Sequence, residues 1–207
     1  MNNRATHVED GSIPDYAGSV IEGVHLIDDV VYEDARGFFL ESYNARRLQA
    51  QIDQSITFVQ DNQSLSKQGV LRGLHYQFKH PQAKLVRILQ GQIWDVVVDL
   101  RQSSASFGQW AAYSLSADRP QQLFIPIGCA HGFLTLSETA LVMYKASDFY
   151  QPKDEYCLRY DDPHLAIDWP LAQLTQGWVQ QESPMLLPIL SAKDAQGLGW
   201  SELAFFK

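Results

Sequence analysis

The chain of 207 residues has only two cysteines and no apolar run long enough to span a membrane. Cys129 and Cys157 could form at most one disulfide, and a chain of this length can bury a stable core without one. We therefore expect free thiols and a location in the reducing cytoplasm. The amino terminus carries acidic residues and a proline where a secretory signal would need an apolar core.

Positive charge is also scarce. The 16 Lys and Arg residues are outnumbered by 24 Asp and Glu, which gives a net charge of −8. This balance disfavours binding along a nucleic-acid backbone or to an anionic membrane surface. An anionic ligand would have to bind in a local basic pocket. The 45% hydrophobic and 12% aromatic content is typical of a globular chain and excludes a long disordered one.

Helical periodicity is sparse as well. Residues 1–19 show neither helical nor strand periodicity, and we interpret them as a loose lead-in to a single domain over residues 20–207. Within that domain the spacing is convincingly helical only from Asn44 to Gln54, where Leu48 and Ile52 share a face and Asn44 can cap the first turn.

Short β-branched and aromatic runs, separated by glycine or polar breaks, make up most of the rest. The clearest hairpin is expected from Lys84 to Arg101, with its turn at Gly91, and a second over residues 133–145. The tail from Leu171 to Lys207 is less regular and is expected to hold short helices. Many short strands and few helices predict an all-β jelly roll or β-sandwich around one cavity, with a few short peripheral helices.

Strand alternation places two polar residues, candidates for a functional site, on the same strand faces as apolar neighbours. Tyr144 shares a face with Val142, and Lys84 shares a face with Val86 and Ile88. Parity alone does not say which face is the inner one. A tyrosine in such a row is more often a core aromatic than an acid, and a lysine is more often solvated.

Two histidine-bearing segments are candidates for chemistry. Arg72 and His75 flank Gly73 near the start of a β region, and His131 lies in Ile125–Phe133, which resembles the second signature of the cupin superfamily. A single histidine is more often a core residue bonded to a carbonyl. Two such segments in one chain favour a site.

The ligands of a metal-binding cupin are incomplete in this chain. Such proteins need two histidines and a carboxylate from the first segment, but Tyr76 and Gln77 follow His75, and His80 does not fit the spacing. A serine nucleophile elbow and a phosphate-binding glycine loop are missing too. We expect no metal and no cofactor, and acid–base chemistry in which His75 is the natural general base and the Tyr144 phenol can donate or accept a proton.

Further short motifs occur along the chain from about Val24 to about Asp194. They are Arg36-Gly-Phe-Phe-Leu-Glu41, Phe58-Val-Gln60-Asp61-Asn62, Arg72-Gly-Leu-His75, Lys84-Leu-Val-Arg, Asp95-Val-Val-Val-Asp99-Leu-Arg101, Phe107-Gly-Gln-Trp110, Ala130-His131-Gly-Phe, Tyr144-Lys-Ala, Glu155 and Ser191-Ala-Lys193-Asp194. Their number and order resemble the dTDP-4-dehydrorhamnose 3,5-epimerase family, a metal-independent cupin group that acts on nucleotide-linked 4-keto-6-deoxy sugars.

The resemblance implies roles for the candidate residues. His75 would remove the proton from a carbon next to the 4-keto group, and Tyr144 would return a proton on the opposite face. Lys84, helped by Arg72, would stabilise the enolate oxygen. Asp194 would hydrogen-bond His75 and set its tautomer.

Other matched positions are those that the family uses to bind the nucleotide sugar, with Tyr150 where an aromatic ring stacks on thymine. They are Arg36, Glu41, Gln60, Asp61, Asn62, Arg72, Lys84, His131, Tyr150, Glu155 and Lys193. The family is commonly homodimeric, with an arginine-bearing segment completing the neighbour's site, so Arg36 is a candidate for acting in trans. One departure is Cys129, which stands where the family usually has phenylalanine and could reshape the pocket wall.

The resemblance therefore implies an isomerase that inverts carbons 3 and 5 of dTDP-4-dehydro-6-deoxy-D-glucose to give dTDP-4-dehydro-L-rhamnose. Three alternatives stay open: a mono-epimerase acting at one carbon, an enzyme for another carrier such as CDP, and a non-catalytic cupin that only binds a sugar nucleotide. The expected partners are a small-molecule substrate and a second copy of the chain.

Overall fold

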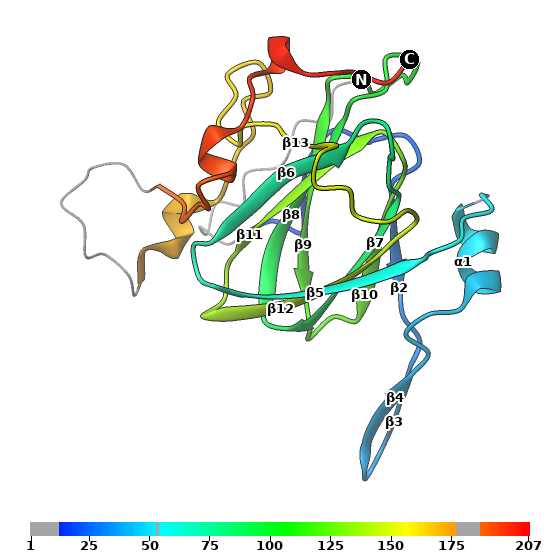
Figure 1. The fold of residues 1–207 in the computed structure, drawn as a ribbon. Helices are drawn as coiled ribbons and strands as arrows, with labels where there is room; N and C mark the ends of the chain where they lie inside the picture. The colour runs from blue at the N-terminus through cyan, green and yellow to red at the C-terminus, as the bar shows by residue number, and fades with distance from the viewer. Residues whose placement is uncertain (1–12, 53, 177–186) are drawn as a thin grey trace.

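The computed structural model describes residues 13–52, 54–176 and 187–207. Two antiparallel sheets pack face to face and form the body of the molecule, with a short hairpin projecting from one end (Figure 1). The predicted all-β sandwich is confirmed. No helix in the described ranges is long and apolar enough to cross a membrane.

The first sheet has six strands, and its order mixes segments far apart in the sequence. From edge to edge it contains β1 (Tyr16–Gly18), β9 (Trp110–Ser116), β8 (Gln92–Asp99), β11 (Cys129–Thr135), β6 (Leu71–Gln77) and β13 (Glu155–Cys157). The central strands are almost entirely buried, as expected for a sheet covered on both faces.

The second sheet has five strands and is partly open to solvent on its outer face. From edge to edge it contains β2 (His25–Asp28), β10 (Gln121–Ile125), β7 (Lys84–Gln90), β12 (Thr139–Ala146) and β5 (Gln60–Lys67). Residues of β5 alternate between exposed and less exposed, which is the pattern of a strand with one face toward solvent.

Both predicted hairpins are wrong in their pairing. The strands of the first, β7 and β8, lie in different sheets, and so do β11 and β12 of the second. Gly91, at φ +77°, carries the chain from one sheet to the other, and a Cβ there would lie 2.1 Å from the carbonyl oxygen of Thr139. A tight glycine turn looks the same in sequence whether its strands pair with each other or separate into two layers.

The lead-in also differs from its prediction near its end. Residues 1–12 lie outside the described residues, but Tyr16–Gly18 form β1 and pair with β9, with Ala17 buried. Three residues are too few to show periodicity in the sequence.

The predicted helix is confirmed as α1 (Ala45–Ile52). Asn44 Oδ1 accepts hydrogen bonds from the backbone N–H groups of Arg46 and Arg47, which caps the first turn. Leu48 and Ile52 are buried against the outer face of the five-stranded sheet. The tail contains the expected short helices, all of 3₁₀ type in its described part: η1 (Leu171–Gln176), η2 (Asp194–Gln196) and η3 (Trp200–Glu202).

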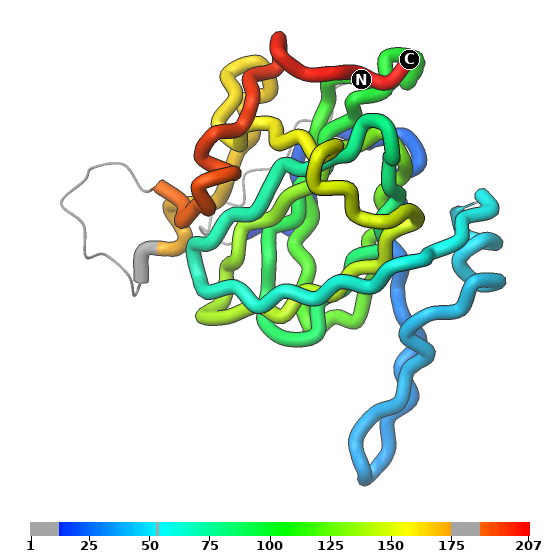
Figure 2. The backbone as a smooth tube through the Cα atoms, viewed as in Figure 1, coloured from blue at the N-terminus to red at the C-terminus, as the bar shows by residue number. Residues whose placement is uncertain are grey.

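The inner layer of the sandwich is apolar at one end and polar at the other. Val86, Ile88 and Val142 of one sheet pack against Val97 and Phe133 of the other. The opposite face of the six-stranded sheet is buried under the carboxy-terminal tail, which runs along one side of the sandwich (Figure 2). The tail thereby brings η2 next to β6.

Strands β3 (Val31–Asp34) and β4 (Gly37–Leu40) form a hairpin that extends away from the sandwich (Figure 1). Its aromatic side chains are largely exposed: Tyr32 by 63%, Phe38 by 70% and Phe39 by 69%. Arg36 is exposed in the turn and forms an ion pair with Asp34.

Candidate active site

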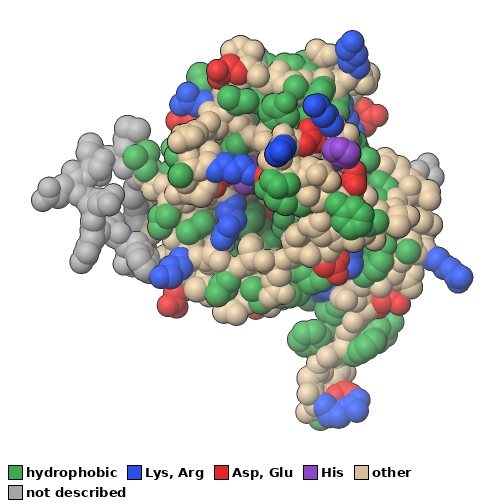
Figure 3. Space-filling view, in the orientation of Figure 1, with side chains coloured by type: hydrophobic (Ala, Val, Ile, Leu, Met, Phe, Trp, Pro, Cys, Tyr) green, Lys and Arg blue, Asp and Glu red, His purple; other side chains and the backbone are tan. Residues whose placement is uncertain are grey.

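A cavity of about 330 Å³ lies at the polar end of the sandwich. It is open on the face where Lys and Arg side chains gather around a hollow (Figure 3). Residues of both sheets and of the tail line it: Asn62, Gln63, Ser64, Arg72, His75, Lys84, His131, Gly132, Phe133, Tyr144, Ser191 and Asp194. Seven of the predicted site residues are in this lining.

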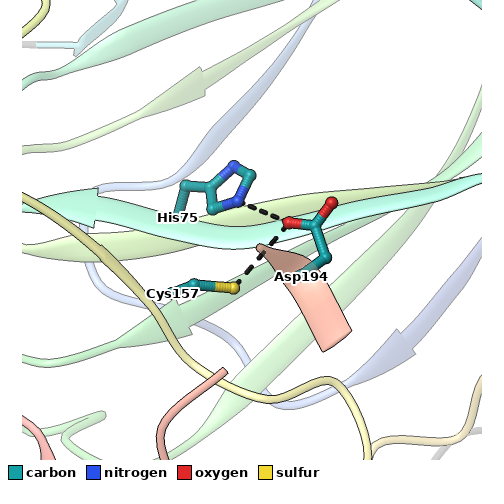
Figure 4. A group of neighbouring side chains, drawn as sticks. All are labelled: His75, Cys157 and Asp194. Atoms are coloured by element: carbon teal, nitrogen blue, oxygen red, sulfur yellow. Dashed lines mark hydrogen bonds and ion pairs between the residues drawn. The ribbon is translucent and has the colours of Figure 1, made fainter. Parts of the chain in front are cut away.

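His75 and Asp194 form a close pair on one wall of the cavity. His75 Nε2 lies 2.6 Å from Asp194 Oδ1 (Figure 4). Asp194 also accepts hydrogen bonds from the Ser191 hydroxyl at 2.7 Å and from the backbone N–H of Gly73 at 3.3 Å. Burial would raise the pKa of this carboxyl, but the bonds from His75 and Ser191 outweigh it and lower the pKa to about 2. An ionised Asp194 accepts the proton of Nε2, which leaves Nδ1 as the basic nitrogen.

Two glycines allow β6 and β11 to approach closely beside this pair. A Cβ on Gly73, at φ +113°, would lie 2.6 Å from Gly132 Cα. The register shifts between His131 and Phe133 where β11 passes β6. This local irregularity lets the Gly73 N–H point at Asp194 instead of at a neighbouring strand.

Lys84 and Tyr144 enter the cavity from the other sheet. Lys84 Nζ lies 5.9 Å from the centre of the Tyr144 ring and 3.5 Å from the carbonyl oxygen of His75. Burial lowers the pKa of Lys84 to about 8, although the charges of Glu155 and Asp95 oppose this shift. Burial raises the pKa of the Tyr144 phenol, so the phenol stays protonated at neutral pH. The parity left open by the sequence is thus resolved: both side chains face inward.

Glu155 lies on the far side of the His75 ring. Its Oε1 is 3.8 Å from His75 Nδ1, and its Oε2 accepts hydrogen bonds from Lys193 Nζ and, at 2.7 Å, from the Tyr150 hydroxyl. Burial would raise the pKa of Glu155, but these two hydrogen bonds and the charge of His75 lower it. The bond to Glu155 is also the main reason that the pKa of Tyr150 rises to about 12.

A second histidine–aspartate pair lies deeper in the same wall. His131 Nε2 is 2.8 Å from Asp95 Oδ2, and the two side chains are 6% and 0% exposed. Burial lowers the pKa of His131, and the charge of Asp95 opposes that effect. His131 therefore presents a neutral ring to the cavity, with Nε2–H donated to Asp95.

The polar rim comes from β5, β6 and the loop after β12. Arg72 Nε donates to the Ser66 hydroxyl at 2.9 Å, which directs the guanidinium along the cavity. Gln60 donates to Asn62 Oδ1 and accepts from the backbone N–H of Tyr150. These contacts connect Tyr150 to the cavity mouth.

Seven predicted residues are outside this lining. Four of them lie beside it: Gln60, Tyr150, Glu155 and Lys193. The other three lie away from the cavity. Asp61 points to the outer face of β5, where it pairs with Lys145 at 2.9 Å. Arg36 lies in the projecting hairpin, and Glu41 follows that hairpin and pairs with Arg47. Cys129 is buried in the apolar inner layer, outside the lining of the described cavity, so it does not form the pocket wall as expected.

Sequence reasoning missed three polar residues at the site. Asp95 and Ser191 each begin a matched motif but had no assigned role; Asp95 is fully buried in a valine-rich strand, and Ser191 lines the cavity. Cys157 lies 3.8 Å from Asp194 Oδ1, and burial raises the pKa of its thiol to about 12. Besides its matched motif, the sequence signal for Asp95 is a carboxylate on an apolar strand, which needs a partner when it is buried.

Together these groups place a histidine that can act as a base, a tyrosine that can act as an acid and a lysine cation around one open cavity. His75 comes from the six-stranded sheet, and Tyr144 and Lys84 come from the five-stranded one. A flat ligand held between the sheets would thus have a base on one side and an acid on the other. Such an arrangement can move protons on and off carbon while a cation stabilises the developing oxyanion.

The comparison with known proteins agrees with this site. The family model described as dTDP-4-dehydrorhamnose 3,5-epimerase matches residues 19–202. The dTDP-4-dehydrorhamnose 3,5-epimerase of Pseudomonas aeruginosa is 46% identical over 186 residues, which cover 90% of this chain and 96% of that protein.

Two solved structures extend the comparison. The dTDP-6-deoxy-D-glucose-3,5-epimerase of Legionella pneumophila, in complex with dTDP-4-keto-L-rhamnose, has a TM-score of 0.80 and 41% identity, covering 91% of this chain and 95% of that one. A 3′-monoepimerase of Streptomyces bikiniensis, in complex with dTDP-quinovose, has a TM-score of 0.75 and 29% identity, covering 87% and 85%. The resemblance predicted from the motifs is confirmed: the chain belongs to the dTDP-4-dehydrorhamnose 3,5-epimerase family and is an epimerase.

Proposed function

We propose that the protein inverts carbons 3 and 5 of dTDP-4-dehydro-6-deoxy-D-glucose to give dTDP-4-dehydro-L-rhamnose. His75 removes the proton next to the 4-keto group, Lys84 stabilises the enolate oxygen with help from Arg72, and Tyr144 returns a proton from the opposite side. Asp194 keeps the proton of His75 on Nε2, so that Nδ1 is free to act as the base.

One observation carries this proposal: His75 and Tyr144 line the same cavity from opposite sheets, with Lys84 in contact with both. Inversion requires proton removal on one face of the ring and return on the other, and an acidic carbon needs its oxyanion stabilised. Because the chain itself supplies base, acid and cation, the proposed reaction uses no metal and no cofactor.

The nucleotide is proposed to bind at the cavity mouth. Arg72, Asn62 and Gln60 offer hydrogen-bond donors there, and Tyr150 is 48% exposed and can stack on a planar base. Deeper in the cavity, His131 Nδ1 can accept a hydrogen bond, because the N–H of this ring is donated to Asp95. The Tyr150 hydroxyl donates a hydrogen bond to Glu155, which also pairs with Lys193, so both residues help to position Tyr150 at this mouth. Asp61, which faces outward, is the weakest member of the proposed binding set.

We propose a homodimer in the cytoplasm, with Arg36 and Glu41 completing the partner's site. The projecting β3–β4 hairpin exposes Tyr32, Phe38 and Phe39, and such an apolar ribbon suits a second copy better than solvent. The two cysteines are both free and buried, in keeping with a reducing compartment.

A mono-epimerase is the second candidate, because the same architecture serves a 3′-monoepimerase in Streptomyces bikiniensis. An enzyme for another carrier such as CDP stays a further alternative, since the proposed proton chemistry does not involve the nucleotide.

Incubation with dTDP-4-dehydro-6-deoxy-D-glucose in heavy water tests the proposal. Deuterium should enter at both carbon 3 and carbon 5, as read by NMR. Label at one carbon alone establishes the mono-epimerase, and label at neither carbon contradicts epimerisation of this substrate. The CDP-linked sugar, run in parallel, decides the carrier.

A further inference from the structure

Next to the proposed base lies a set of side chains that the epimerisation does not explain. Among the described residues, His75, Cys157 and Asp194 are the group of three whose possible metal-ligand atoms all lie within 4.8 Å of one another (Figure 4). We propose that this group is an inhibitory site for a soft divalent cation such as Zn²⁺, distinct from any catalytic metal.

The donor set has the composition and spacing of a zinc site. Imidazole nitrogen, thiolate sulfur and carboxylate oxygen are the three ligand types that Zn²⁺ takes in proteins. In a tetrahedral site with ordinary bond lengths, neighbouring ligand atoms are about 3.3 to 3.6 Å apart. Cys157 Sγ and Asp194 Oδ1 are already 3.8 Å apart, whereas His75 Nε2 and Asp194 Oδ1, at 2.6 Å, have to separate by about 0.7 Å.

The backbone holds these ligands on one face. Cys157 of β13 is the direct antiparallel partner of His75 of β6, so both side chains lie on the same side of the sheet. The neighbouring pair, Tyr156 and Tyr76, stacks on the opposite side with ring centres 5.3 Å apart. These stacked rings fix the edge strand and leave the thiol beside Asp194.

Asp194 is presented to the metal from the tail. The Ser191 hydroxyl donates to Oδ2, whereas the Gly73 N–H donates to Oδ1, the oxygen that also contacts His75 and Cys157. A carboxylate oxygen has two lone pairs, so Oδ1 can keep the Gly73 hydrogen bond while it binds the metal. His75 and Asp194 line the open cavity, which gives an ion a route in and leaves the fourth position of the tetrahedron for water.

Binding of the cation removes the base, an effect that rests on the proposed function. The thiol of Cys157 loses its proton to solvent when the metal–sulfur bond forms. The proton on His75 Nε2 is replaced by the metal and the neutral ring keeps a proton on Nδ1 instead. Nδ1 then has no lone pair with which to accept a proton from carbon.

Metal binding is tested apart from activity. Protein without a histidine tag is titrated with Co²⁺, whose bond to thiolate gives a charge-transfer absorption in the near ultraviolet, and the Co²⁺ is then displaced with Zn²⁺. Wild type should bind one ion per chain with this absorption, and so should Cys129→Ala, which removes the other buried cysteine. Cys157→Ala and Cys157→Ser should lose the absorption and bind Zn²⁺ at least about tenfold more weakly. Circular dichroism checks that each variant is folded.

The heavy-water assay supplies the second measurement, with each variant compared to its own rate without zinc. Zn²⁺ should stop exchange in wild type and Cys129→Ala at the concentration where it binds, and a chelator should restore it. In Cys157→Ser the midpoint should rise at least about tenfold. Absence of the thiolate absorption in wild type, or equal zinc sensitivity in Cys157→Ser, overturns the site. Zinc binding through Cys157 in a protein that exchanges neither carbon would instead refute the proposed function and leave the site standing.

Discussion

Two histidine–aspartate pairs lie side by side on the six-stranded sheet. They share the same kind of hydrogen bond but differ in solvent exposure and in the segment that supplies the carboxylate. His75 and His131 are direct partners across β6 and β11, and each places Nε2 on a carboxylate. The side chain of His75 is 25% exposed and that of His131 only 6%. Asp95 belongs to the adjacent strand, whereas Asp194 arrives from the tail, 119 residues further along the chain.

This difference in exposure matches the proposed roles of His75 as a base and of His131 as a fixed neutral ring. Burial lowers the pKa of His131, so its ring stays uncharged and can only bind. His75 has its second nitrogen toward Glu155 and the cavity, where a charge formed during the reaction is balanced by two carboxylates. The difference in exposure supports the two proposed roles, binding for the buried pair and proton transfer for the more exposed one.

The largest expected effect is the contrast between the two histidines. His75→Asn should lower kcat about a thousandfold, because asparagine has no basic nitrogen. His131→Asn should act mainly by raising KM, with kcat within about tenfold of wild type, because it removes a contact that is present before and during the reaction. Steady-state kinetics on both variants measures this split.

A control with dTDP alone separates binding from chemistry: calorimetry should give His75→Asn an affinity close to wild type. A His131→Asn enzyme with the larger loss of kcat would reverse the assignment of base and binding residue.

Much of this architecture could be predicted from the sequence, and the failures have a common cause. The all-β class, the helix near Leu48 and the grouping of Tyr144 with Val142 on one strand face follow from local periodicity, but which face is inward does not. Strand pairing does not, because Gly91 makes a tight turn whether the flanking strands pair or separate into two sheets. Asp95 looked like one polar residue among valines because its partner His131 is 36 residues away and meets it only through the sheet register.

The second effect concerns the two carboxylates. Asp194→Asn should lower kcat about a hundredfold, because an amide neither balances the charge on His75 nor keeps its proton on Nε2. Asp95→Asn should instead lower the free energy of unfolding by about 1 to 3 kcal/mol. The substitution replaces a fully buried carboxylate whose two oxygens both accept from His131 Nε2. Urea unfolding and kcat on both variants give the comparison. Loss of stability without loss of kcat in Asp194→Asn would show that its role is structural.

The smallest expected effect is a shift in the pH dependence of kcat, which involves Lys84 and both histidine–aspartate pairs. Lys84 lies between them: burial lowers its pKa to about 8, while Glu155 beside His75 and Asp95 beside His131 both raise it. Above that pH Lys84 loses the charge that stabilises the oxyanion, so kcat should fall with a midpoint near pH 8. The pKa of Tyr144 is raised by burial, so the phenol keeps its proton there and does not cause the fall.

Removing one of the two negative neighbours should move this alkaline limb. Asp95→Asn takes away a charge that favours the protonated amine, so the midpoint should shift to lower pH, whereas Asp118→Asn, the same change at an exposed turn, should leave it in place. The profile of kcat from about pH 6 to about pH 10 measures the shift. A limb that stays at the wild-type pH in Asp95→Asn would mean that Lys84 is not the group that titrates, and that the buried pair acts on the substrate through His131 alone.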